Sequence, residues 1–180
     1  MDVMHWFRGE YPVRVSGRGA IRLHQDGRTL ADTVELDFVF KDGVSFRYDA
    51  TLASSHGGTF EVVRGVNGTI RLAWSHAWLF KEADAPTQGW EVYATRQQVL
   101  DDEGIVLIAN ATQLAAQGQL QSGAGLPHPP VYYALVDFVK SVNEGAPVAC
   151  SMAEGSRATQ VAILANQAVV RGGSVEIAVG

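Results

Sequence analysis

The sequence predicts an α+β fold in which a large, mostly antiparallel open sheet is covered on one face by helices. Through the first two thirds of the 180 residues, apolar and polar side chains alternate with a period of two, as in half-buried strands. Turn dipeptides at Asp26-Gly27, Asp42-Gly43 and Asn67-Gly68 punctuate these segments and indicate hairpins. After about residue 130 the apolar period becomes helical. We expect a single domain over residues 1–180, because no internal repeat divides the chain.

The first element is a short helix over residues 2–8, and the sheet is expected within residues 11–110. In residues 33–40 the even positions are apolar and most odd positions are polar, and residues 44–51 repeat the alternation. Arg47 is therefore expected across this hairpin from Glu35 or Asp37. Further strands are expected at residues 11–17, 59–64, 68–74, 77–82, 89–95 and 104–110.

A change of composition follows the sheet. Residues 113–130 are rich in Gln, Gly, Ser, Ala and Pro, which have little to bury, and predict a mobile loop. The next segment, residues 131–144, is expected to be a helix that ends at Gly145. Its apolar stripe consists of Val131, Leu135, Phe138, Val139 and Val142.

A second helix is predicted over residues 152–171. Ser151 and Glu154 have the spacing of a capping box, and Gly172 stops the helix. The many alanines of this helix permit a close approach to the sheet. A last short strand, residues 174–178, can return to that sheet, so we expect both helices on one face.

Composition excludes several classes of function. The net charge of −5 and the 14 scattered basic residues argue against nucleic-acid binding. No apolar run approaches the roughly 20 residues that a membrane-spanning helix needs, and no signal peptide precedes the domain. The single cysteine, Cys150, excludes an internal disulfide and fits a reducing compartment. We therefore expect a cytoplasmic protein without membrane or nucleic-acid partners.

Three residues are candidates for substrate binding. Asp2 and His5 share a helix face and can reach a substrate hydroxyl, with His5 able to move a proton near neutral pH. The alternative is an N-cap aspartate and a partly buried histidine beside Trp6. His56 lies in a glycine-rich loop between two strands, where binding residues are common, although a solvated loop histidine is the alternative.

The sequence predicts no metal site. His24, His76 and His128 have no further ligand at a suitable spacing. The acidic run at residues 101–103 lacks the alternation of a calcium loop and is typical of a solvated turn. Cys150, without a paired base, is interpreted as structural. The tryptophans of the predicted sheet can stack on sugar rings, but are more often core or interface residues; they are Trp74, Trp78 and Trp90.

No dinucleotide-binding motif is present. Such a site needs Gly-x-Gly-x-x-Gly between a strand and a helix, so that amide N–H groups meet the pyrophosphate. Gly17 and Gly19 lack the third glycine and join strand-like segments, while Gly172 and Gly173 follow a helix. We interpret both pairs as turns, and we expect this chain to bind no cofactor and to contain no Rossmann domain.

An ordered series of motifs nevertheless resembles one family. The opening Asp2-Val3-Met4-His5-Trp6, the strand pair around Asp32-Thr33, and Glu61 with residues 65–72 are followed by residues 137–148 and 154–175. Together these segments resemble the C-terminal domain of the Gfo/Idh/MocA oxidoreductases, a family named for glucose-fructose oxidoreductase, inositol dehydrogenase and a rhizopine-catabolism protein.

The resemblance implies an NAD(P)-dependent oxidoreductase that acts on a sugar, cyclitol or related polyol. It also implies a Rossmann domain upstream or in another chain. The family's His-x-x-Asp pattern would place its histidine before Met1 if Asp2 is the aspartate. We therefore predict that this chain alone is inactive, and we assign no catalytic residue to it. The helix that begins near Tyr132 lacks the histidine that family members often carry there, which bears on the substrate class.

Two hypotheses follow from the resemblance. In the first, the chain is the substrate-binding and oligomerisation domain of such an oxidoreductase. In the second, it is a free-standing binding or interaction module derived from that domain, without redox activity. In either case we expect a homodimer or higher oligomer through the open face of the sheet. The candidates for that contact are Arg47, Arg71, Glu91 and Tyr93.

Overall fold

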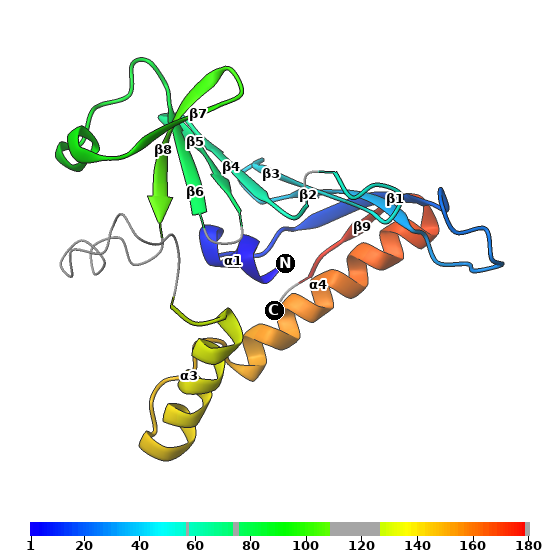
Figure 1. Ribbon diagram of the computed structural model, residues 1–180. Helices are drawn as coiled ribbons and strands as arrows, with labels where there is room; N and C mark the ends of the chain where they lie inside the picture. Colours follow the sequence, from blue (N-terminus) through cyan, green and yellow to red (C-terminus); the bar gives the residue numbers. More distant parts are fainter. Residues whose placement is uncertain (57, 74–75, 109–126, 179–180) are drawn as a thin grey trace. The chain divides into compact units, whose positions relative to one another are not determined.

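The computed structural model describes residues 1–56, 58–73, 76–108 and 127–178 (Figure 1). These residues form two compact units. The first unit combines Met1–His56 with Pro147–Gly180, and the second comprises Gly57–Ala146. The predicted antiparallel sheet is present as two sheets, of four strands in the first unit and five in the second.

The first unit is a four-stranded antiparallel sheet with a long helix along one face (Figure 1). The strand order is β3-β2-β1-β9, so β9 returns to the sheet, as predicted, and pairs there with β1. Helix α4 packs on β1, β2 and β9. The elements of this unit are α1 (Asp2–Arg8), β1 (Arg14–Ala20), β2 (Thr33–Val39), β3 (Ser45–Thr51), α4 (Met152–Arg171) and β9 (Ser174–Glu176).

The core of the first unit lies between α4 and the sheet. Phe38 is fully buried, and its ring lies 5.7 Å from that of Phe46 on the neighbouring strand. The register places Val15, Phe38 and Phe46 in one row across the sheet, on the face that α4 covers. The buried cluster consists of Val15, Leu36, Phe38, Val161, Ala165, Ala168 and Ile177.

Two glycines allow α4 to approach β1 closely. A Cβ atom at Gly17 would lie 2.5 Å from Leu36 Cδ2, and one at Gly19 would lie 2.6 Å from Val169 Cγ1. Both glycines lie within the strand, Gly17 at its centre and Gly19 next to its last residue. The prediction that Gly17 and Gly19 form a turn is therefore wrong; they are small because a helix packs against them.

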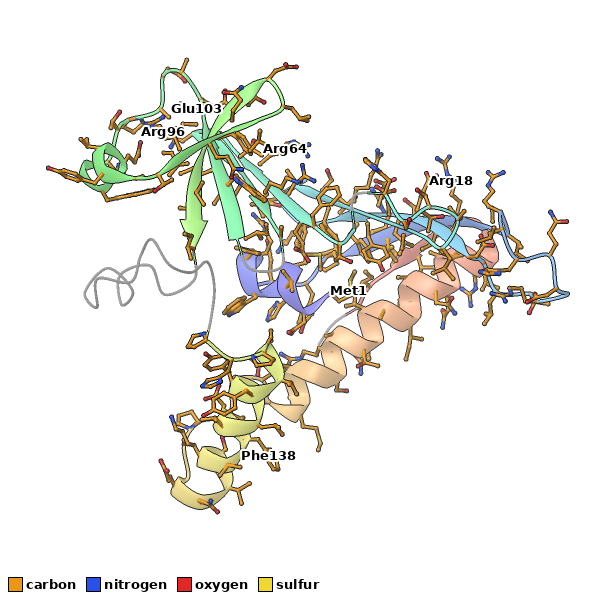
Figure 2. The ribbon with its side chains drawn as sticks, in the orientation of Figure 1. Met1, Arg18, Arg64, Arg96, Glu103 and Phe138 are labelled. Carbon is orange, nitrogen blue, oxygen red and sulfur yellow. The ribbon has the colours of Figure 1, made fainter. Side chains whose placement is uncertain are left out.

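The opposite face of this sheet is charged. Arg47 Nε donates to Asp37 Oδ1 at 3.0 Å, which confirms the expected contact across the hairpin. One row further along, Arg18 pairs with Glu35, and Figure 2 shows Arg18 on the side away from α4. Because all of these side chains are largely exposed, the pairs contribute little to stability.

A buried carboxylate organises the loop between β1 and β2. Asp32 is 4% exposed, and its oxygens accept hydrogen bonds from the backbone amides of Arg22, Leu23 and His24 at 2.8, 2.8 and 2.9 Å. These amide donors hold the pKa of the Asp32 carboxyl well below its usual range. The loop is therefore fixed through its backbone.

The second unit contains a five-stranded antiparallel sheet of order β4-β5-β6-β8-β7 (Figure 1). Cross-strand rows such as Val63, Ile70, Leu79 and Ile105 give one face an apolar centre. The elements of this unit are β4 (Glu61–Gly65), β5 (Gly68–Leu72), β6 (His76–Lys81), the 3₁₀ helix η1 (Gly89–Tyr93), β7 (Arg96–Val99), β8 (Asp102–Ile108) and α3 (Pro130–Glu144).

The predicted strand at residues 89–95 is wrong. Gly89–Tyr93 forms η1 instead, and the edge strand begins only at Arg96. The helical turn is held by Glu91, whose carboxylate accepts from the Gln88 amide at 2.9 Å and pairs with Lys81 at 2.7 Å. A buried acid that satisfies the first turn outweighs the weak alternation of the segment.

Helix α3 begins at Pro130 and ends at Gly145, which has a φ of 67°. It buries none of its residues, and the five members of its apolar stripe are each more than half exposed. Most of the predicted mobile loop, residues 113–126, lies outside the described residues. No helix in the described part of the chain is long and apolar enough to cross a membrane.

Candidate functional site

The candidate residues Asp2 and His5 lie on α1, a helix of seven residues. The N-cap is Met1, so the interpretation of Asp2 as the N-cap is wrong; it is the first helical residue, exposed, with its charge next to the helix N-terminus. His5 belongs to the last turn, which Gly9 closes with a φ of 68°. None of the hydrogen bonds among the described residues joins Asp2 to His5 directly.

His5 packs against an aromatic residue that follows the helix. The His5 and Tyr11 rings are parallel, with centroids 4.0 Å apart and an interplanar angle of 3°. The Nδ1 atom of His5 is buried and has no hydrogen-bond partner among the described residues. The histidine is partly buried, as the alternative interpretation held, but its neighbour is Tyr11, whereas Trp6 is 86% exposed.

Tyr11 connects α1 to the start of α4. Its hydroxyl donates to the backbone carbonyl of Glu154 at 3.2 Å. Glu154 in turn forms the predicted capping box with Ser151, in which the two side chains and backbone amides exchange hydrogen bonds of 2.7 and 3.2 Å. The Tyr11 hydroxyl is thus held at a fixed place beside the first turn of the long helix.

Charges around the tyrosine influence its ionisation. Burial raises the pKa of Tyr11, and the negative charge of Asp2 raises it further, while Arg157 acts in the opposite direction. The phenol therefore stays protonated at neutral pH and acts as a hydrogen-bond donor. The pKa of Glu154 is lowered, chiefly by its hydrogen bond from the Ser151 amide.

Asp2, His5 and Tyr11 together form the candidate site. A carboxylate, an imidazole and a phenol meet beside the N-terminus of α4, all within the first unit. Such a group can donate hydrogen bonds to a hydroxyl-rich ligand and accept hydrogen bonds from it.

His56 is separate from this group. Its side chain is exposed, and its backbone amide donates to Ser54 Oγ at 3.3 Å. Among the described residues, no polar or ring contact links His56 to Asp2 or His5. The structure thus brings two of the three predicted residues to one helix and leaves the third in a surface loop.

The remaining histidines occupy unrelated positions. His24 contributes its backbone amide to Asp32, and His128 packs its ring 4.2 Å from Tyr132 at the start of α3. His76 begins β6. In the described part of the chain, no group of three or more His, Cys, Asp or Glu side chains is placed to hold a metal ion.

The glycines that suggest a phosphate loop do not fit a dinucleotide. Gly17 and Gly19 are covered by α4, and Gly172 is the αL residue that ends that helix. A pyrophosphate needs free amides at a helix N-terminus that follows a strand, which these positions do not offer. These two glycine pairs therefore do not form a pyrophosphate-binding loop.

The residues proposed for oligomeric contact differ in exposure. Glu91 is only 3% exposed and paired with Lys81, so its assignment to a contact surface is wrong. Tyr93 is 91% exposed and Arg47 lies on the charged face. Arg71 packs over the Phe60 ring at 4.5 Å.

Of the tryptophans, Trp78 donates to Gln97 at 3.0 Å and Trp90 is half exposed, while Trp74 lies outside the described residues.

Tyr11 is the site residue that the sequence did not reveal. It was assigned only to a strand at residues 11–17, whereas β1 begins at Arg14. Its pairing with His5 depends on the tight turn at Gly9, and no periodic pattern signals such a contact. A tyrosine six residues after a helical histidine, with a glycine between them, is the one available clue.

Comparison with known proteins identifies the fold. No protein-family model matches the sequence, and no curated protein matches it. Solved structures do match: an oxidoreductase domain protein from Kribbella flavida has a TM-score of 0.68 and 16% identity over 99% of this chain. The chain therefore shares the fold of about half of this oxidoreductase, as its resemblance to the C-terminal domain of the Gfo/Idh/MocA family implies.

Two further structures support this assignment. Levoglucosan dehydrogenase, in a complex with NADH and levoglucosan, matches with a TM-score of 0.68 and 14% identity over 99% of this chain. An aldose-aldose oxidoreductase from Caulobacter crescentus, in a complex with glycerol, matches with a TM-score of 0.63 and 12% identity over 98%. The chain spans 48%, 48% and 44% of these three proteins, about half of each.

Proposed function

We propose that this chain is the substrate-binding and oligomerisation domain of an NAD(P)-dependent oxidoreductase that acts on a sugar, cyclitol or related polyol. The observation that carries the proposal is the match of nearly the whole chain to about half of several oxidoreductases. Gly17 and Gly19 pack under α4 and form no phosphate loop, and we propose that another domain binds the cofactor.

The substrate class rests on the ligands of the structural neighbours. Levoglucosan dehydrogenase was solved with levoglucosan, and the aldose-aldose oxidoreductase with glycerol. Both ligands carry several hydroxyl groups. Asp2, His5 and Tyr11 supply donors and acceptors suited to such groups.

Within this proposal, each residue has a defined part. The nicotinamide, when bound by its own domain, accepts or supplies the hydride. Asp2 accepts a hydrogen bond from a substrate hydroxyl, and His5 forms a second hydrogen bond with the substrate. Tyr11 holds the imidazole plane in a fixed orientation. His56, exposed in its loop, contacts a more distant hydroxyl.

The test is a titration of the isotope-labelled chain with levoglucosan and with glycerol, followed by NMR. Resonances of Asp2, His5 and His56 are expected to shift, and His5→Gln is expected to weaken the response. His24→Gln is the matched control, because His24 contributes only its backbone amide to the fold. Equal responses in both variants, or shifts confined to other residues, would contradict the assignment of the site.

Catalysis is tested separately from binding. The chain alone is proposed to bind no NAD(P) and to reduce no NAD(P)+ in the presence of polyols. The DNA in frame before the Met1 codon distinguishes the two hypotheses. A glycine-rich strand and helix encoded there supports the oxidoreductase, whereas a stop codon or an unrelated gene favours the free-standing binding module.

Self-association is proposed through an open face of the five-stranded sheet. Val63 is 37% exposed at the end of an apolar row that continues through Ile70 and Leu79. Exposed apolar surface of this kind favours association. Val63→Lys is expected to shift the chain toward a monomer in light scattering, while Tyr48→Lys, at a similarly exposed position on the other sheet, is not.

A further inference from the structure

The hairpin that joins β7 to β8 ends in an unusual turn. Val99 pairs with Asp102, which leaves Leu100 and Asp101 as a two-residue turn. Leu100 has a φ of 57° and is the one residue other than glycine with a positive φ in the described part of the chain. Turns of this kind favour Gly, Asn or Asp, because a larger side chain crowds the backbone there.

The side chain of Leu100 does not compensate for this strain within the fold. It is 87% exposed, so the hairpin gains almost no burial from it. A strained backbone that carries an exposed apolar side chain indicates a function outside the unit itself. We call Leu100, Asp101 and Asp102 the hairpin tip.

The hairpin tip combines the leucine with charge. Asp101 and Asp102 are exposed, and neither has an ion-pair partner among the described residues. Gln98 Nε2 donates to the Leu100 carbonyl at 3.1 Å, and Arg96 pairs with Glu103 at 2.9 Å below the turn (Figure 2). The tip is therefore a rigid surface with one apolar and two acidic side chains.

A surface of the opposite character lies on the β1–β2 loop. Leu23 and Leu30 are 52% and 71% exposed, and Arg22 is exposed without an ion pair among the described residues. Asp32 fixes the backbone of this loop through three amides. The loop thus presents apolar and basic side chains in a preformed arrangement.

We propose that the hairpin tip of one copy of the chain docks on the β1–β2 loop of a second copy. Leu100 packs against the exposed apolar side chains of this loop, and the two carboxylates face Arg22. Opposite charges bordering apolar side chains set the orientation of the contact. Because both surfaces are already ordered, little conformational entropy is lost on binding.

The first test is Leu100→Asn in the full chain, studied by sedimentation equilibrium at low salt. Asn tolerates a positive φ, so the variant is expected to unfold at the same denaturant concentration or a higher one. Its self-association is expected to be weaker by about ten-fold or more, the effect of losing a central contact residue. Val66→Asn is the matched control, because Val66 is 91% exposed in the β4–β5 turn and lies outside the contact.

The second test uses reversed charges. Arg22→Glu alone and Asp101→Lys with Asp102→Lys are each expected to weaken self-association. An equal mixture of the two proteins is expected to associate more strongly than either alone, because one keeps a native tip and the other a native loop. Unchanged association of Leu100→Asn, or no gain in the mixture, would overturn the proposal and leave the proposed sheet-face contact and polyol binding unaffected.

Discussion

Phe38 provides the most direct test of how the first unit is held together. Its side chain is fully buried between the sheet and α4, in the cluster that includes Val15, Val161 and Ala165. We consider the substitution Phe38→Ala, which removes the whole ring and leaves a void beneath the helix. The strand keeps its backbone hydrogen bonds, so the change isolates side-chain packing.

The magnitude follows from burial. Removing a fully buried phenylalanine side chain forfeits about 1.5–3 kcal/mol of transfer free energy. The unfilled cavity and the lost ring contact with Phe46, at 5.7 Å, bring the expected total to about 3–5 kcal/mol. This is a large share of the stability of an ordinary domain.

The assay is urea unfolding followed by far-ultraviolet circular dichroism, which reports the loss of α4. Tyr48→Ala is the control, since Tyr48 lies on the same sheet but is 42% exposed, and a loss below about 1 kcal/mol is expected. A loss below about 1.5 kcal/mol for Phe38→Ala would show that the helix and sheet are not packed as described.

Two further substitutions test other features of the first unit. Gly19→Ala places a methyl group 2.6 Å from Val169 Cγ1 and 2.8 Å from Ala31 Cβ, so we expect a loss of about 1–3 kcal/mol in urea unfolding. Val169→Ala in the same chain is expected to recover part of it, and no recovery would refute the assignment of the clash. Asp32→Asn tests the loop. The pKa of Asp32 is lowered in the folded state, so the stabilisation that its carboxylate contributes is complete above the unfolded-state pKa of about 4. This stabilisation is lost as the pH falls toward the folded-state pKa. Unfolding measured from pH 7 downward is therefore expected to show a smaller acid-dependent loss in Asp32→Asn than in the parent chain, and identical pH profiles would contradict the role of the carboxylate.

The sequence predicted strands and helices correctly where an element buries one face and exposes the other. Alternation over residues 33–40 predicted β2 because one face meets α4 and the other meets water. The capping box at Ser151 and the stop at Gly172 gave α4 its bounds to the residue. Local chemistry and tertiary packing agree at these positions.

The incorrect predictions arose where contacts outside the periodic pattern determine the local structure. Residues 89–95 alternate weakly, but the buried Glu91 carboxylate binds the Gln88 amide and Lys81, and this selects a helical turn. Gly17 and Gly19 were interpreted as turn residues, because no local pattern indicates that the helix of residues 152–171 packs against them. The pairing of His5 with Tyr11 depends likewise on tertiary structure and not on periodicity.

The carboxylate of Asp32 has a consequence for how this protein can change. It binds the backbone amides of residues 22–24, so the course of the main chain there does not depend on which side chains these three residues carry. Substitutions there can alter charge, size and polarity while the main chain keeps its course. Single mutations in this loop can therefore change binding preference without changing its backbone. The loop is a suitable starting point for a library of variants screened for binding to new partners.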